Sequence, residues 1–288
     1  MGLSKDFWKI LGNDRDNANT CKKALKLVMD APEGPERDGL LAFIYHQGIG
    51  VEFDLDKAFE YAEKAANEKE GIALYLLGIM CEHGETPDQL HSGPRQKYDH
   101  YDAERFMERC AATDSSWAED AHLWLGDFFW DSARGGDREI AIEHYEIIGK
   151  HNKEAAAKLS DYYYDYAEYK EFKDPELNEK ALRWTEIAAT DDPAGYAYRA
   201  GSMLAEGIGC KEPAFRLARK YLEDAYYCGQ WEAAEMIAMM FQERADSDTR
   251  PDSEKERCRK EADSWRKSAE KLRLAQIANH PDPSQEED

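Results

Sequence analysis

Residues 39–71 read GLLAFIYHQGIGVEFDLDKAFEYAEKAANEKEG, and this stretch decides the fold. Its first part, Gly39 to Gln47, places apolar side chains on one face at the 3.6-residue period of a helix. Gly48 and Gly50 end that helix, because glycine adopts left-handed backbone angles without a Cβ penalty. Asp54 is the expected N-cap of a second amphipathic helix. Such a helical hairpin cannot bury its apolar face alone, so the pattern should recur along the chain.

An alanine followed seven residues later by another apolar, usually small, residue does recur. The pairs are Ala24/Ala31, Ala58/Ala65, Ala103/Cys110, Ala141/Ile148, Ala181/Ala188, Ala218/Ala225 and Ala262/Ala269. The leading alanines are 34, 45, 38, 40, 37 and 44 residues apart. A larger apolar residue stands between the members of each pair: Leu27 or Val28, Tyr61, Met107, Tyr145, Trp184, Tyr221 and Trp265. Small residues let neighbouring helices approach closely, and the large residue fills the gap. This period predicts an all-α fold, an α-solenoid of about six antiparallel helix-pair repeats.

The repeated pattern also resembles a known family. Its template is Ala-x-x-x-Leu-Gly-x-x-Tyr-x-x-Gly-x-Gly-Val, an Asp, then Lys-Ala-x-x-Tyr-x-x-Lys-Ala-Ala, which is similar to the Sel-1-like repeat, a relative of the tetratricopeptide repeat. The best copy spans Leu41 to Ala66, and the next best spans Gly201 to Ala225. Partial copies cover most of residues 17–270. The resemblance implies a right-handed superhelix that serves mainly as a scaffold for protein contacts.

The pattern also predicts where the repeats begin and end. We expect residues 1–30 to form N-terminal capping helices and residues 31–274 to form the solenoid, since terminal repeats must shield their outer faces from water. Pro32 to Asp38 should be a loop, because proline and glycine interrupt helices. Residues 84–99, GETPDQLHSGPRQKYD, should be an insertion loop, either a recognition element or a tolerated insertion. Residues 275–288 are expected to be a disordered acidic tail.

Charge and hydropathy limit the classes of partner. The net charge is −22 and the pI is about 4.8, which argues against nucleic-acid phosphates and anionic lipids. The same charge could attract a basic protein, or it could serve solubility alone. No apolar run approaches the roughly 20 residues of a membrane span, and the first residues do not read as a signal peptide. We therefore expect a cytoplasmic protein with no membrane partner.

Cysteine usage agrees with that compartment. The chain has six cysteines, which are widely dispersed and form no Cys-x-x-Cys pair. Some secreted members of the family that the chain resembles cross-link each helix pair with a disulfide, and that spacing is missing here. Cys81 and Cys110 occupy core positions of the template, where a free thiol behaves as a small apolar group. Reduced cysteines are therefore expected.

No catalytic or cofactor motif emerges. The sequence lacks a serine nucleophile elbow, a His-Glu-x-x-His helix, a phosphate loop and paired Cys/His spacings. The two Gly-Ile-Gly elbows follow helices rather than strands and carry no P-loop lysine, so we interpret them as hairpin turns. His83, His91 and His100 are eight and nine residues apart across the predicted loop, a spacing that favours accidental proximity over a metal site. We expect no enzyme activity, no cofactor and no metal.

The remaining candidate is a binding surface. In tetratricopeptide-like superhelices the first helix of each pair lines the concave face, and the resemblance places ten residues of this chain there. They are Phe43, His46, Tyr75, Ile79, Glu82, Asp127, Trp130, Asp161, Tyr164 and Tyr198. Aromatic rings beside carboxylates would form a peptide groove that selects basic groups. The alternative is that these rings pack against the second helices as part of the core.

Three functional hypotheses follow. The leading one is a non-catalytic protein–protein interaction scaffold that binds a basic protein partner, such as a signalling or secretion protein, along its concave face. A narrower hypothesis, which the resemblance suggests, is a bacterial immunity or antitoxin protein that neutralises a secreted toxin by direct binding. A hydrolase-like enzyme is the third, and it would need a clustered nucleophile and base that the linear sequence does not show.

Overall fold

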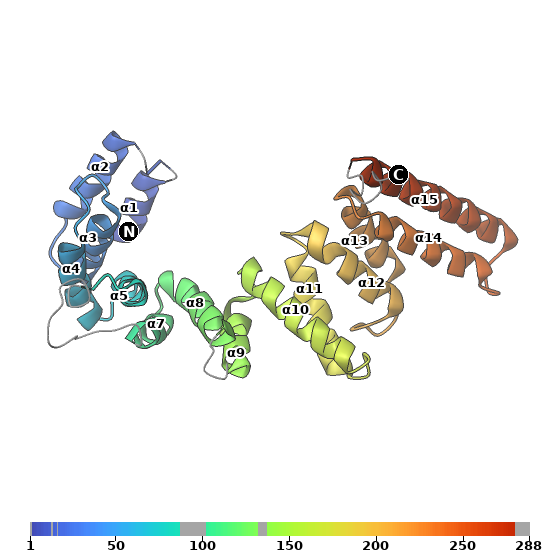
Figure 1. Ribbon diagram of the computed structural model, residues 1–288, viewed down its shortest axis with the longest axis horizontal. Coiled ribbons are helices and arrows are strands. Elements are labelled where there is room, and N and C mark those ends of the chain that lie inside the picture. The colour runs from blue at the N-terminus through green and yellow to red at the C-terminus, as the bar shows by residue number, and fades with distance from the viewer. Residues whose placement is uncertain (1, 13, 16, 87–101, 132–136, 280–288) are drawn as a thin grey trace, which may run out of the picture. The chain divides into compact units, whose positions relative to one another are not determined.

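Helices make up all the regular structure of the described residues. The computed structural model (Figure 1) describes residues 2–12, 14–15, 17–86, 102–131 and 137–279, and no β-strand occurs in these ranges. The chain divides into two compact units, Met1–Ile148 and Gly149–Asp288.

The first unit consists of helices that pack in consecutive pairs. Its helices are α1 (Leu3–Leu11), α2 (Ala18–Met29), α3 (Pro35–Gln47), α4 (Leu55–Asn67), α5 (Gly71–His83), α7 (Asp102–Ala111), α8 (Trp117–Asp131) and α9 (Arg138–Ile148). Helix α1 packs on α2, α3 on α4, α5 on α7, and α8 on α9.

The second unit repeats this arrangement. Its helices are α10 (Lys153–Tyr169), α11 (Pro175–Ala188), α12 (Tyr198–Glu206), α13 (Phe215–Tyr227), α14 (Trp231–Asp246) and α15 (Asp252–Asn279), and a short π-helical turn, η1 (Pro193–Ala197), precedes α12. The pairs are α10 with α11, α12 with α13, and α14 with α15 (Figure 1). The predicted all-α fold of paired helices is therefore confirmed.

Two predicted boundaries are corrected. Residues 35–38 belong to α3 rather than to a loop, because proline is well suited to the first helical position, where no backbone N–H is needed. Helix α15 continues to Asn279, beyond Leu274, where the tail was expected to begin. The segment from Lys271 to Asn279 lacks proline and glycine, so nothing in it stops the helix.

Close contact within each helix pair depends on a small residue in the first helix. A Cβ built on Gly78 of α5 would lie 2.7 Å from Cε of Met107 on α7. A Cβ on Gly126 of α8 would lie 2.3 Å from Cε1 of Tyr145, a fully buried ring on α9. Since real side chains do not approach so closely, a larger residue at either position requires the facing side chain to move, which the flexible Met107 can do more easily than the buried Tyr145 ring.

The filling residue stands four positions after the leading alanine. Met107 and Tyr145 have this spacing, as predicted, but in the α12–α13 pair it is Leu222, not Tyr221, that lies against Gly201. In the α10–α11 pair the equivalent residue is Thr185 rather than Trp184, and it faces Ser160. Four residues make slightly more than one helical turn, so this position returns closer to the face of the alanine than the third one does.

The two Gly-Ile-Gly elbows are tight turns, as predicted. Gly48, Gly50, Gly207 and Gly209 all have positive φ, between 67° and 79°. The second glycine of each elbow also lies against the preceding repeat: a Cβ on Gly50 would be 2.9 Å from the carbonyl oxygen of Cys21, and one on Gly209 would be 2.4 Å from that of Asn178. The elbows thus join successive repeats as well as the helices within one. Asp54 caps α4 as predicted, since its side chain accepts from the Lys57 backbone N–H at 3.0 Å.

None of the six cysteines is in a disulfide. The predicted insertion loop lies outside the described residues from position 87 onward, as do His91, His100 and residues 280–288 of the predicted tail.

Gly209→Ala should destabilise the second unit more than Gly84→Ala does the first. The φ angle is +70° at Gly84 and +76° at Gly209, so alanine is strained to a similar degree at both positions. A Cβ on Gly84, however, meets nothing within 4 Å. We expect Gly209→Ala to cost about 1–3 kcal/mol more, because the Asn178 backbone must move away. Urea unfolding of the two variants measures the difference. Equal losses would mean that the elbow does not depend on this approach.

A histidine pair joins α8 to α9. The Nδ1 atoms of His122 and His144 are 2.8 Å apart, and Phe129 stacks on the His144 ring. Burial lowers the pKa of both rings, and burial together with the neighbouring His122 lowers the pKa of His144 to about 4. Both rings are therefore neutral imidazoles, and the Nδ1–H of one ring donates a hydrogen bond to the Nδ1 of the other.

This pair should make stability fall as the pH falls. The unfolded chain binds a proton at each histidine near pH 6.5, whereas folded His144 does so only near its pKa of about 4, so the contribution is present above pH 6.5 and is lost on acidification toward pH 4. We expect the free energy of unfolding to fall by about 1 kcal/mol. This is less than the shift in the His144 pKa implies, because the rings are half-exposed. Unfolding free energies of His144→Phe at several pH values should decrease less on acidification than those of the wild type. His151→Gln, which alters an exposed histidine, is the control and should follow the wild type.

Candidate protein-binding surface

Two predicted aromatic residues of the first unit, Phe43 and Tyr75, contact Trp117. The Tyr75 ring lies 5.1 Å from that of Trp117, and Phe43 lies 6.1 Å from it and 5.1 Å from Trp8. Phe43 is only 9% exposed, so its ring is part of the packing rather than a free contact surface. Burial, followed by the charge of Asp120, raises the pKa of Tyr75. The structure therefore brings Phe43 and Tyr75 together, through two tryptophans that were not predicted.

The predicted carboxylates of the first unit are held by hydrogen bonds. Trp124 of α8 donates its indole N–H to Glu82 Oε2 of α5 at 2.8 Å. Tyr145 donates its hydroxyl to Asp127 Oδ1 at 2.6 Å. Glu82 is exposed and uses one oxygen in its bond to Trp124, whereas Asp127 is half-buried. Glu82 is thus the carboxylate best placed to meet a partner.

The other three predicted residues of the first unit occupy separate surroundings. His46 Nε2 lies 3.0 Å from Glu85 Oε2. Ile79 packs against the buried core of α3, α4, α5 and α7. The Arg138 guanidinium lies 5.1 Å from the centroid of the Trp130 ring, a cation–π distance. Tyr75 and Trp117 pack against the same core as Ile79 does.

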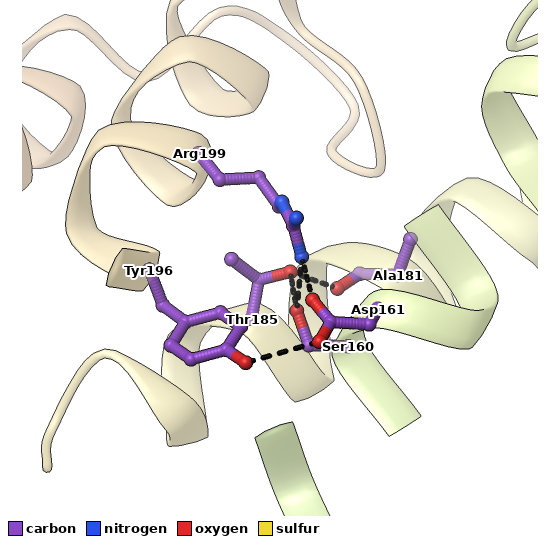
Figure 2. Close-up of polar contacts among 6 residues, drawn as sticks. All are labelled: Ser160, Asp161, Ala181, Thr185, Tyr196 and Arg199. Carbon is purple, nitrogen blue, oxygen red and sulfur yellow. Dashed lines mark hydrogen bonds and ion pairs between the residues drawn. The ribbon is translucent and has the colours of Figure 1, made fainter. Parts of the chain in front are cut away.

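In the second unit two predicted residues, Asp161 and Tyr164, lie beside Arg199. Arg199 of α12 donates to Asp161 Oδ1 at 2.6 Å and to Ser160 Oγ at 3.2 Å, both on α10 (Figure 2). Tyr196 donates its hydroxyl to the other carboxylate oxygen of Asp161 at 3.2 Å. The arginine thus ties two successive repeats together and compensates the charge of Asp161.

A buried layer lies beneath this contact. Ser160 and Thr185 are fully buried, and their hydroxyl oxygens are 2.7 Å apart. Thr185 donates to the carbonyl of Ala181 at 2.7 Å, so the bond between the hydroxyls is donated by Ser160 (Figure 2). Ser160 is then left with lone pairs that accept from Arg199, so both buried hydroxyl groups have hydrogen-bond partners.

Tyrosine rings complete the second surface. The Arg199 guanidinium lies 4.5 Å from the Tyr164 ring centroid and 5.5 Å from that of Tyr196. Burial, with Asp161 second, raises the pKa of Tyr196 to about 12, and burial also raises that of Tyr164. Tyr198 is half-buried, and the structure shows no ring contact that joins it to this group. Asp161 and Tyr164 therefore both lie beside Arg199, and Tyr198 is near enough to Tyr164 to contribute to the rise of its pKa.

Sequence reasoning missed Arg199, Tyr196, Trp117 and Trp124. The template emphasises small and apolar positions, so a lone arginine just before the Ala200-Gly201 pair carried no signal. Trp124 stands just before the Leu125-Gly126 pair, at the position equivalent to Arg199. A rule that examines this position in every repeat could have found both.

The described part of the chain contains neither a metal-binding cluster nor a membrane-spanning helix. No three His, Cys, Asp or Glu side chains there lie close enough together to hold a metal ion. No helix among the same residues is both long and apolar enough to cross a membrane.

Paired helices with small-residue seams and exposed first-helix surfaces define a helical-repeat scaffold. Comparison with family models matches the Sel1 repeat at residues 40–69, 71–91, 153–192 and 195–230. The chain therefore contains Sel1 repeats at four positions, and the resemblance seen in the sequence is confirmed.

Solved structures share the fold. A Sel1 repeat protein from Oxalobacter formigenes is 21% identical with a TM-score of 0.52, and the match covers 94% of this chain and 99% of that one. A protective antigen of uropathogenic Escherichia coli strains, which displays an SLR fold, is 19% identical with a TM-score of 0.50, over 96% of this chain and 60% of that one. No curated protein matches significantly.

Arg199→Lys should loosen the junction between α10 and α12. A lysine keeps the charge but loses the planar guanidinium that reaches Ser160 and Asp161 together and lies over Tyr164. We expect the unfolding free energy to fall by about 1 kcal/mol. Arg183→Lys is the matched control, since Arg183 lies over Trp184 at 4.7 Å and is exposed. Equal effects of the two changes in urea unfolding would argue against a special role for Arg199.

Proposed function

We propose that this chain is a non-catalytic scaffold that binds a basic segment of a protein partner along its first helices. The observation that carries the proposal is the pairing of Glu82 with Trp124 on neighbouring first helices, α5 and α8. Sel1 repeats are helical scaffolds that generally serve protein interaction, which supports a protein partner.

Glu82 suits the recognition of a cation. Its carboxylate is exposed, and the indole bond fixes its position while leaving acceptor sites unused. A pre-positioned side chain loses little conformational entropy on binding. The Trp124 ring, stacked on Phe128 with a centroid distance of 5.0 Å, adds flat apolar area beside the charge.

The two units differ in what they offer a partner. Asp161 is already paired with Arg199, so its negative charge is compensated within the chain. We therefore assign cation selection to the first unit, and to the second a contribution of polar and aromatic contact area around Tyr164. The net charge of −22 adds long-range attraction for a basic partner. An immunity protein would be a special case in which that partner is a basic toxin.

Glu82→Gln should weaken binding to basic peptides. The test is retention of the intact chain on an array of equal-length peptides that differ in Lys and Arg content. We expect basic peptides to retain the wild type best, with retention falling clearly between about 0.05 and 0.5 M salt as charges are screened. Glu82→Gln should lower retention roughly threefold to tenfold, the effect of losing one charged contact.

The control is Glu60→Gln, which removes the same charge from an exposed position on α4, a second helix. It should retain basic peptides nearly as well as the wild type. Equal losses for Glu60→Gln and Glu82→Gln would leave only a non-specific charge effect. Equal retention of acidic and basic peptides would contradict the proposed partner class.

A further inference from the structure

A pocket of cationic and aromatic side chains lies in the second unit, between α13, α14 and α15. Its volume is about 310 Å³, and its lining consists of Phe215, Arg216, Arg219, Phe241, Arg244, Arg257 and Cys258. Four of these seven residues are arginines and none is acidic, in a chain whose net charge is −22. We propose that this pocket binds an aryl phosphate monoester group.

The two phenylalanines hold the guanidinium groups in place. The rings of Phe215 on α13 and Phe241 on α14 meet edge to face with centroids 5.2 Å apart. Arg244 lies over Phe215 at 4.1 Å, and Arg219 lies over Phe241 at 5.2 Å. Guanidinium planes stacked on rings keep their N–H groups at the edges, where an anion can accept hydrogen bonds.

The positive charge of the pocket is only partly compensated. Arg219 pairs with Glu223 at 2.6 Å, but Arg257 lies 3.9 Å from Glu254, which is already bonded to Arg250 at 2.8 Å. Among the residues that the structure describes, Arg216 and Arg244 have no carboxylate within ion-pair distance. At least two guanidinium groups are therefore available to an anion.

A phosphate monoester fits these features. It carries close to two negative charges at neutral pH and several strong acceptor oxygens, which match two uncompensated guanidinium groups. An aromatic substituent would find the Phe215 and Phe241 rings beside the phosphate. A nucleic-acid strand does not fit, since the acidic chain around a single pocket would repel its successive phosphates.

The test is calorimetric titration of the intact chain with phenyl phosphate at low ionic strength. We expect saturable binding that is at least tenfold tighter than that of inorganic phosphate, which lacks the ring, and of benzenesulfonate, which carries one negative charge. A phosphotyrosine tripeptide separates two sources of the group: tighter binding than phenyl phosphate identifies a protein side chain, and equal or weaker binding identifies a small molecule.

Arg216→Gln and Arg244→Gln should each weaken phenyl phosphate binding roughly tenfold. Arg266→Gln is the control, since Arg266 lies on α15 outside the pocket and bonds Asp263. Arg216 is exposed and makes no ion pair or side-chain hydrogen bond within the described residues, so its variant should keep the wild-type circular dichroism and unfolding midpoint. Absence of saturable phenyl phosphate binding, or equal weakening by Arg216→Gln and Arg266→Gln, would overturn the proposal.

Discussion

The seam between the two helices of each pair is the contact on which the rest of the structure depends. A glycine or serine on the first helix receives a larger side chain from the second, as Gly126 receives Tyr145 and Gly201 receives Leu222. Because each seam uses one face of a short helix, the opposite faces must be covered by the next pair. The Gly-Ile-Gly elbows add backbone contact to the preceding repeat, at Cys21 and Asn178. Stability is thus a sum of local pairings rather than the property of one large core.

This construction leaves the outward sides of the first helices open to other side chains. In the first unit they carry aromatic rings and the exposed Glu82, fixed by Trp124. In the second they carry Arg199, which spans from α12 to α10 and neutralises Asp161. Trp124 and Arg199 occupy equivalent positions, and each bonds a carboxylate of the preceding first helix, Glu82 on α5 and Asp161 on α10.

Charge is distributed unevenly within this acidic chain. Two arginines of the α13–α15 pocket, Arg219 and Arg244, lie over phenylalanine rings, and only Arg219 of these two is paired with a carboxylate of the described residues. Stacking keeps them ordered while their hydrogen-bonding edges stay available. A strongly negative average charge is thus compatible with one site for an anion and another for a cation, because screening confines each to its own surroundings.

The sequence by itself determined the all-α fold, the pairing of helices, the glycine elbows and the Asp54 cap, since each depends on residues close together in the chain. It placed Asp161 and Tyr164 on one surface through the repeat register. Only the tertiary structure decided that Phe43 is enclosed by Trp8 and Trp117, that Asp161 is neutralised by Arg199, and that four arginines from three helices line one pocket. These contacts join residues far apart in sequence, and their geometry depends on how closely each helix pair packs, which periodicity does not specify.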